Sequence, residues 1–196
     1  MGIKIGSSSN RKGVTINPST VLFNGNNVKQ IKNNSKEIWA YAIPLVPILT
    51  SDNGSDGGVA SCYKANASGG GAYLAFDGNH DTWTDMAYGG SVAIGKCYIQ
   101  YKFAVPTVVK KVMVYLTSKR TQHKLYTADI QYSDDGITWH TLYTIDTTNA
   151  PFDTEITLDI NNVNGISALY WRLQGKTNAS GGNLIISTMQ FYGYQN

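Results

Sequence analysis

The fold is decided by the stretch Tyr73-Leu74-Ala75-Phe76-Asp77-Gly78-Asn79-His80-Asp81-Thr82-Trp83. An apolar run ends at Phe76, the turn-forming residues Asp77-Gly78-Asn79 follow, and Asp81 and Thr82 add side-chain oxygens before the next aromatic residue. A tight turn rich in such oxygens has two common uses: it binds a hard cation, or it locks a long loop against a β core. The residues alone leave both uses open.

Downstream of this stretch, short apolar or alternating segments are separated by turn residues. They predict strands at 59–64, 98–103, 108–116, 128–133, 138–143, 154–160, 168–174 and 184–192. Asp134-Asp135-Gly136 predicts a hairpin turn between two of them. The chain has 20 glycines, 13 tyrosines and only 15% charged residues, and no segment shows a helical pattern. We therefore expect an all-β fold, an antiparallel β-sandwich.

Residues 1–47 are expected to form a separate, smaller part. The strand-like segments 19–23, 28–32 and 36–41 are joined by Asn-rich turns, which predicts a three-stranded β-meander. Such a meander has too little core to be stable alone, so it needs a partner. Pro44 and Pro47 then favour an extended connector. The predicted domains are an attachment module with its linker, 1–47, and the sandwich, 48–196.

Composition and charge exclude several functions. No segment approaches the ~20 apolar residues of a membrane span, and the first residues lack the apolar segment of a secretion signal. We therefore expect a protein made in a cytoplasm that does not insert into membranes. Residues 1–50 carry six basic groups and one acidic group, but the basic residues form no run. Ordinary solvated charge explains them, so no nucleic-acid partner is expected.

The cysteines and histidines are not spaced as in known catalytic or metal-binding motifs. Cys62 and Cys97 are interpreted as unpaired thiols rather than a disulfide, because nothing else indicates an oxidising compartment. His80-Asp81 resembles a metal-phosphohydrolase dipeptide, but His123 and His140 do not lie at a ligand spacing from it. No nucleophile or phosphate-loop motif is present. We expect no enzyme activity.

Six segments, in order and in register, resemble a known family. Their sequences are Val59-Ala60-Ser61, Ala75-Phe76-Asp77-Gly78-Asn79, Tyr98-Ile99-Gln100-Tyr101-Lys102-Phe103, Tyr132-Ser133-Asp134-Asp135-Gly136-Ile137-Thr138-Trp139, Tyr170-Trp171-Arg172-Leu173 and Met189-Gln190-Phe191-Tyr192-Gly193. Together they resemble the discoidin (coagulation-factor type C) domain, a galactose-binding-like jelly roll that occurs in many carbohydrate-binding modules. The resemblance covers about residues 55–194. It implies a jelly-roll sandwich. Trp139 and Trp171 alternate with polar neighbours on predicted strands, so we expect both in the core.

The resemblance also implies a structural Ca²⁺ in the Phe-Asp-Gly-Asn-x-x-Thr loop. Asp77, Asn79 and Thr82 would supply its oxygen ligands. The family tends to place an acidic residue shortly before the last strand, and here that pair is Ser187-Thr188. A hydroxyl in place of a carboxylate removes one negative charge, which weakens the site or lets the loop fold without metal.

Discoidin modules bind ligands through loops at one end of the sandwich, and the resemblance assigns these loops to about 63–73, 83–96, 117–127 and 175–183. Sugar recognition needs an aromatic face and hydrogen-bond donors. The carbohydrate-binding candidates are Trp83, Tyr88, Arg120, His123 and Tyr126. Two alternatives stay open: Trp83 packs in the core beneath its loop, and segment 118–126 is a protein contact surface or a solvated loop.

The N-terminal part carries a second resemblance. The sequence from Val21 to Lys32, ending at Glu37-Ile38-Trp39, is similar to a short module of tail and baseplate proteins in phages of Gram-positive bacteria. It implies a virion protein present in many copies or as a homo-oligomer, docked to other virion proteins through residues 1–45, whose sandwich binds host-surface glycan in adsorption. The alternatives are a purely structural virion component and a bacterial carbohydrate-binding module.

Overall fold

The computed structural model describes residues 43–63, 70–86, 93–179 and 183–195, together with the backbone of four short strands before residue 41. The chain divides into two compact units, Met1–Tyr41 and Ala42–Asn196. None of the helices that it describes is long and apolar enough to span a membrane.

The first unit contains two small antiparallel sheets. Strand β1 (Leu22–Phe23) pairs with β2 (Asn26–Asn27), and β3 (Gln30–Asn33) pairs with β4 (Lys36–Ala40). The expected meander is therefore divided: residues 26–27 pair back onto β1, whereas 30–33 pair forward with β4. The two-residue connection from Phe23 to Asn26 fixes the first register, since it leaves no room for a longer turn.

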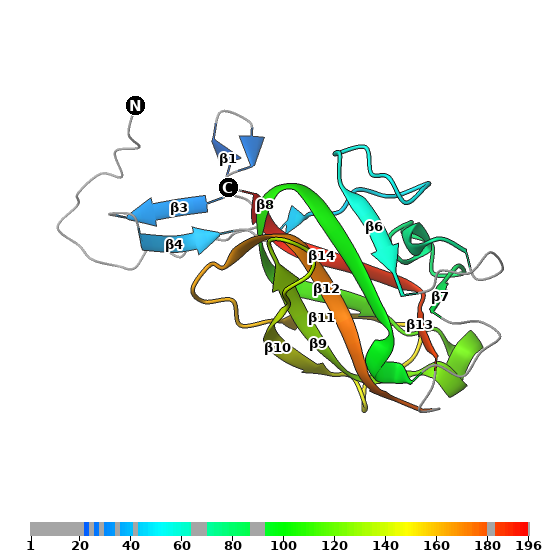
Figure 1. Ribbon diagram of the computed structural model, residues 1–196. Helices are drawn as coiled ribbons and strands as arrows, with labels where there is room; N and C mark the ends of the chain where they lie inside the picture. The colour runs from blue at the N-terminus through cyan, green and yellow to red at the C-terminus, as the bar shows by residue number, and fades with distance from the viewer. Residues whose placement is uncertain are drawn as a thin grey trace. The chain divides into compact units, whose positions relative to one another are not determined.

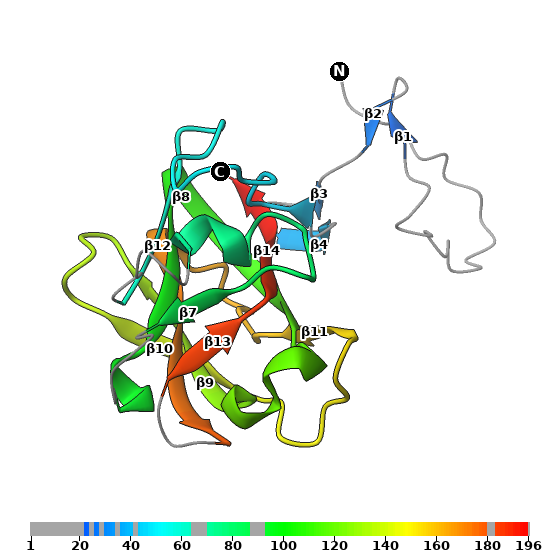
Figure 2. The ribbon, with the colours of Figure 1, turned by 90° about the vertical axis from the view of Figure 1, so that its right-hand side faces the viewer.

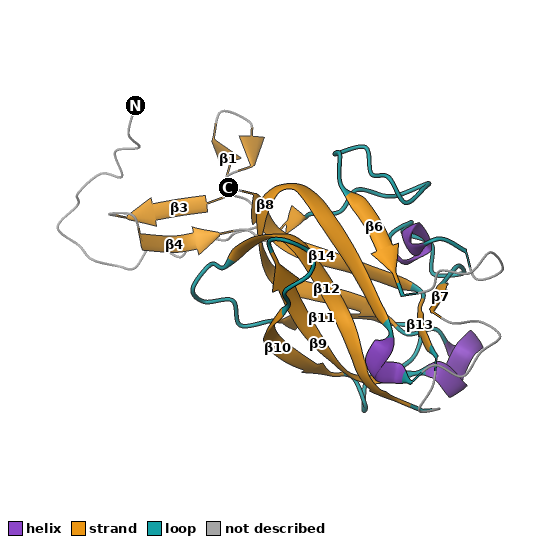
Figure 3. Cartoon of the chain, viewed as in Figure 1, coloured by secondary structure: helices purple, strands orange, loops and turns teal. Residues whose placement is uncertain are grey.

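The second unit is built around one long strand, β8 (Tyr98–Tyr115). Its first half pairs with β6 (Val59–Cys62) and β12 (Ser167–Asn178). Strand β12 is followed in the sheet by β9 (Leu125–Ser133) and β10 (His140–Asp146). The second half pairs with β11 (Glu155–Asp159) and β14 (Thr188–Gln195). All these pairings are antiparallel, and Figures 1 and 3 show β8 passing through both parts of the sandwich. The sandwich prediction is confirmed.

One continuous β8 replaces the two strands expected at 98–103 and 108–116. Residues 98–102, 107–109 and 111–115 have ladder partners, and Pro106 lies in the exposed stretch between the first two ranges. The missing N–H of proline therefore breaks no ladder, and the strand continues from one half of the eight-stranded sheet into the other.

The strand expected at 184–192 is divided into two. Residues Leu184–Ile186 form β13, which pairs with β7 (Thr84–Met86), and β14 begins at Thr188. The break lies at Ser187, whose hydroxyl donates hydrogen bonds to the carbonyls of His80 and Thr82 at 2.8 and 2.7 Å. Figure 2 shows β7 and β13 side by side. The described part of the unit also contains three short 3₁₀-helices: η2 (Ala72–Ala75), η3 (Ile94–Lys96) and η4 (Ser118–His123).

The segment expected to be a connector belongs partly to the sandwich. Ile43–Pro44 forms β5, which pairs with β14, and Val46 is buried. The Gln190 side chain accepts from the Val46 N–H at 3.0 Å and donates to its carbonyl at 2.8 Å. These bonds extend the pairing past Pro44, so the division between the units lies at residues 41 and 42 and not near residue 48.

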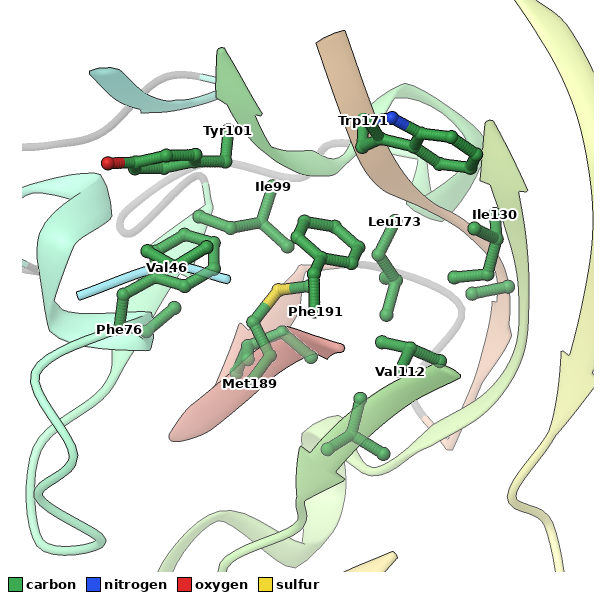
Figure 4. Close-up of a cluster of buried hydrophobic side chains, with 14 of the residues drawn as sticks. Val46, Phe76, Ile99, Tyr101, Val112, Ile130, Trp171, Leu173, Met189 and Phe191 are labelled. Carbon is green, nitrogen blue, oxygen red and sulfur yellow. The ribbon is translucent and has the colours of Figure 1, made fainter. Parts of the chain in front are cut away.

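The core lies inside the sandwich and is rich in aromatic rings (Figure 4). Trp171, Tyr101 and Phe191 are fully buried. The Trp171 indole N–H donates to the Thr107 carbonyl at 3.0 Å, and the Tyr101 hydroxyl donates to Asp56 at 2.6 Å, so the polar ends of these rings are satisfied. Trp171 is a core residue as predicted.

Candidate functional site

The loop of residues 77–82, the Asp77 loop, is closed by its own side chains. Asp77 accepts hydrogen bonds from the Asn79 N–H at 2.8 Å and from the Thr82 hydroxyl at 2.6 Å. Gly78 has a φ of +70°, a conformation that favours glycine. Asn79 in turn accepts from the Asp81 N–H at 2.9 Å. The turn predicted from the sequence is therefore present, with both its Asp and its Asn side chains engaged.

The same loop is tied to three distant parts of the sandwich. Ser187 holds it from the junction of β13 and β14, as described above. The His80 ring stacks on Tyr115 with centroids 3.8 Å apart, and its Nε2 lies 3.4 Å from Glu155. Asp81 forms an ion pair with Lys119 of η4 at 2.7 Å, which lowers the pKa of this carboxyl. The loop thus locks against the β core, one of the two uses that its composition suggested.

The oxygens of the loop also suit a hard cation. Thr82 Oγ1 lies 2.6 Å from Asp77 Oδ2 and 2.9 Å from the Asn79 carbonyl, and Thr188 Oγ1 lies 3.4 Å from that carbonyl. Neighbouring oxygen ligands of a Ca²⁺ ion lie about this far apart, because each binds at ~2.4 Å. Only one carboxylate contributes, and among the described residues no group of three or more His, Cys, Asp or Glu is placed to hold a metal. This donor set fits a Ca²⁺ site whose ligands carry little negative charge.

A second cluster lies directly after this loop, where Trp83, just before β7, contacts η4. The Arg120 guanidinium lies over the half-buried Trp83 ring, 4.5 Å from its centroid. The Thr117 hydroxyl accepts from the Lys119 N–H at 3.2 Å at the start of η4, and Arg120 itself has the non-helical angles φ −137° and ψ 45°. We call Trp83, Asp85, Arg120 and His123 the loop-end cluster.

Asp85 is the charged residue buried in this cluster. Its side chain belongs to β7 and is only 6% exposed, and its Oδ1 has no hydrogen-bond partner among the described residues. Burial raises the pKa of this carboxyl, and the charges of His123 and Arg120 oppose the rise. Arg120 Nε is also buried without a hydrogen-bond partner in the described part of the chain. An acceptor and a donor thus lie in one cluster without bonding to each other.

The structure brings together only part of the predicted carbohydrate-binding set. Trp83 and Arg120 are in contact, and His123 is near enough to act on Asp85. Tyr126 lies in β9, where its carbonyl accepts from the Thr147 N–H at 2.7 Å, and the described residues show no ring contact between it and Trp83. Tyr88 lies outside the described residues. Sequence reasoning missed Asp85; the available signal was an acidic side chain between Thr84 and Met86, two positions after the candidate aromatic.

Trp139 forms a second stack with an arginine, on the outer face of the sheet. The sequence predicted Trp139 in the core, but its ring is only half-buried. The Arg172 guanidinium lies 3.8 Å from the centroid of this ring. Arg172 also lies 5.2 Å from the Tyr98 centroid, and its Nε donates to Gln131 at 2.7 Å. The Trp139 indole N–H donates to the Gly136 carbonyl at 3.2 Å, and this hydrogen bond helps to hold the ring against the outer face of the sheet. We call Tyr98, Trp139 and Arg172 the sheet-face cluster.

Comparisons with known proteins agree with this architecture. The model of the F5/8 type C domain family matches residues 59–188. The family 32 carbohydrate-binding module of Clostridium perfringens NanJ, solved with galactose, is 13% identical with a TM-score of 0.55, covering 69% of this chain and 93% of the module. The C. perfringens module CpGH89CBM32-5, solved with GalNAc-β-1,3-galactose, is 15% identical with a TM-score of 0.55, covering 68% and 92%.

A third solved structure is chitosan-binding module 1 from a Paenibacillus chitosanase/glucanase, 21% identical with a TM-score of 0.53, covering 69% of this chain and 93% of that module. At these identities the likeness concerns the fold. No curated protein matches the chain.

Proposed function

The chain belongs to the F5/8 type C domain family, and on that basis we propose that its sandwich binds carbohydrate at the loop-end cluster. The observation that carries the proposal is the Arg120 guanidinium stacked on the half-buried Trp83 ring, beside His123. An aromatic ring offers a face to the C–H side of a sugar, and Arg and His offer donors for its hydroxyls.

A glycan array tests this proposal. The full chain is displayed in many copies on beads, because single-site sugar binding is weak and multivalency makes it measurable. The expected result is retention on a subset of glycans, and a loss of at least about tenfold in Arg120→Ala and His123→Ala, equivalent to ~1.4 kcal/mol. Lys111→Ala is the control, since it removes an exposed cation paired with Asp159 at 3.5 Å, outside the loop-end cluster, and should retain binding. If multimeric wild-type protein retains no glycan or cell-wall material, the proposal is wrong.

We further propose that the protein is a phage virion component of tail or baseplate type, made in the host cytoplasm. Its sandwich then contacts host-surface glycan in adsorption, and its N-terminal part, assigned from the sequence to residues 1–45, docks it to other virion proteins in many copies. Two features support this: the resemblance of residues 21–39 to phage tail modules, and the separation of Met1–Tyr41 as its own unit. The sheets of that unit are small, and sheets of this size need a partner for stability.

Deletion of residues 1–41 tests the docking role, because β5 at Ile43–Pro44 belongs to the sandwich and must be kept. The truncated chain should fold and bind glycan but not enter phage particles. Incorporation at the wild-type level would contradict the docking proposal. Incorporation of the full chain without any glycan binding would instead favour a structural virion protein, and glycan binding without any incorporation would favour a bacterial carbohydrate-binding module.

The Asp77 loop is proposed to hold a structural Ca²⁺. Asp77, Asn79 and Thr82 would hold it through the oxygens that lie together there, with Thr188 beside them. A bound Ca²⁺ supplies charge that holds these oxygens together, and it takes no part in sugar chemistry. With one carboxylate, binding is expected to be weak.

A further inference from the structure

Two buried polar atoms of complementary chemistry belong to the loop-end cluster and are not bonded to each other. Asp85 Oδ1 is an acceptor and Arg120 Nε is a donor, and neither has a hydrogen-bond partner among the described residues. Native proteins pair almost all buried polar groups, because leaving one unpaired costs the full desolvation of that group. Two such atoms in one cluster indicate a site that is completed by something other than the chain's own side chains.

We propose that Asp85 and Arg120 form an acceptor–donor pair that recognises a neutral sugar through two neighbouring hydroxyl groups. One hydroxyl donates to Asp85 Oδ1, and the next accepts from the Arg120 guanidinium. The inference rests on the proposed carbohydrate function, and it adds the class of ligand and a binding residue, Asp85, that the sequence did not indicate.

The charges of the cluster select a neutral ligand. A buried carboxylate repels the acid group of a uronic acid, and the guanidinium over Trp83 repels the ammonium of an amino sugar. A pyranose hydroxyl both donates and accepts, so a vicinal pair satisfies both protein atoms without adding charge. Cys97 is the other titratable group close to Asp85, and burial raises the pKa of its thiol, so it adds no negative charge.

Arg120 covers the site when no ligand is bound. Its guanidinium occupies the face of Trp83 on which a sugar ring would stack, and both unpaired atoms are shielded from solvent. Binding therefore requires the guanidinium to move off the ring toward the sugar hydroxyls. The kink at Arg120, which separates the two turns of η4, places this residue where its side chain is not held by a regular helix.

The proposal predicts opposite effects of one substitution on stability and on binding. Asp85→Asn keeps the shape of the side chain but removes a buried charge whose Oδ1 has no hydrogen-bond partner among the described residues. The melting temperature should therefore rise, by about 2–4 °C. Sugar affinity should fall by about tenfold, because a hydrogen bond to a carboxylate is roughly twice as strong as one to an amide. A merely structural Asp85 would give the reverse, a lower melting temperature and unchanged affinity.

The experiment uses the full chain and measures binding by NMR titration with four neutral methyl glycosides (of galactose, glucose, mannose and N-acetylglucosamine), with glucosamine and with galacturonate. Wild type should bind one or more of the neutral glycosides and discriminate against both charged sugars. Asp85→Asn should bind the neutral glycosides about tenfold more weakly and gain relative affinity for galacturonate. Asp85→Leu, which cannot accept a hydrogen bond, should bind still more weakly.

The control is Asp159→Asn, which removes an exposed carboxylate paired with Lys111 at 3.5 Å, away from the cluster. It should change neither the affinity nor the order of the sugars. If both Asp85 variants bind the neutral glycosides with the affinity of wild type, this inference is wrong and the carbohydrate proposal stays intact. Absence of binding to every sugar by wild type, in the titration and on the array, would overturn both.

Discussion

The sandwich contains two tryptophan–arginine stacks that look alike and differ in what surrounds them. In the sheet-face cluster Arg172 lies 3.8 Å from the Trp139 centroid, and its Nε donates to Gln131. In the loop-end cluster Arg120 lies 4.5 Å from the Trp83 centroid, and its Nε has no partner among the described residues. The same pair of residue types is thus completed within the chain in one place and left incomplete in the other.

This difference separates a structural contact from a ligand site better than residue type does. Arg172 is held between two rings and by a side-chain amide, so its charge is balanced by fixed neighbours. Burial lowers the pKa of Arg172, although an arginine stays protonated throughout the working range of a protein. Arg120 lies over a ring in the same cluster as Asp85, and both its Nε and Asp85 Oδ1 lack a hydrogen-bond partner among the described residues. Such an arrangement costs stability unless a ligand completes it.

The largest expected effect is on stability, in Arg172→Ala. This change removes a hydrogen bond to Gln131 and the stack on Trp139, and we expect the free energy of unfolding to fall by about 2–3 kcal/mol. Urea unfolding measures it. Arg120→Ala is the matched comparison and should leave stability nearly unchanged while it weakens sugar binding. Equal destabilisation by the two changes would break the distinction between the clusters.

A smaller effect is expected from Ca²⁺. At ten times the dissociation constant the ion should stabilise the sandwich by about 1.4 kcal/mol, a shift of about 3–6 °C in melting temperature. Thr188→Glu adds a carboxylate beside the Asn79 carbonyl and should enlarge the shift at lower Ca²⁺ concentration. The measurement is thermal unfolding in excess Ca²⁺ and in chelator. Identical curves in both proteins would show that the Asp77 loop is a lock that does not use metal.

The Ca²⁺ result also sharpens the comparison of the two clusters. The Asp77 loop is joined to η4 through the ion pair of Asp81 and Lys119, next to Arg120. No such link connects it to the sheet-face cluster in the described part of the chain. A change in how well the Asp77 loop is ordered should therefore alter the sugar affinity at Trp83 and leave the stack of Arg172 on Trp139 unchanged.

Much of the sandwich could be predicted from the sequence, because alternation and turn residues are local signals. The turn at Asp135-Gly136 is an example: Asp135 accepts from Ser133, Ile137 and Thr138, which holds the pKa of its carboxyl far below the usual range. Pattern alone could not show that β8 continues through Pro106, because that depends on where the neighbouring strands end. It could not show the break at Ser187 either, since the bonds of this residue go to a loop more than a hundred positions earlier.

The site could be predicted only in part for the same physical reason. Trp83 and Arg120 were identified as an aromatic and a cation in different loops, and the structure puts them in contact. Asp85 carries no local signal, because its importance comes from burial without a partner, which only the folded chain shows. Trp139 was expected in the core, and its place on the sheet face depends on Arg172, which comes from another strand.

The central claim is that sugar contacts the loop end and not the sheet face, and the indole N–H signals test it most directly. The chain has four tryptophans, so a ¹⁵N-labelled full-length sample gives few and well-separated indole signals, assigned by Trp83→Phe and Trp139→Phe. During titration with the neutral methyl glycoside that binds best, the Trp83 signal should move in a saturable way while those of Trp139 and Trp171 stay in place. A saturable shift of the Trp139 signal with Trp83 unmoved would contradict the account.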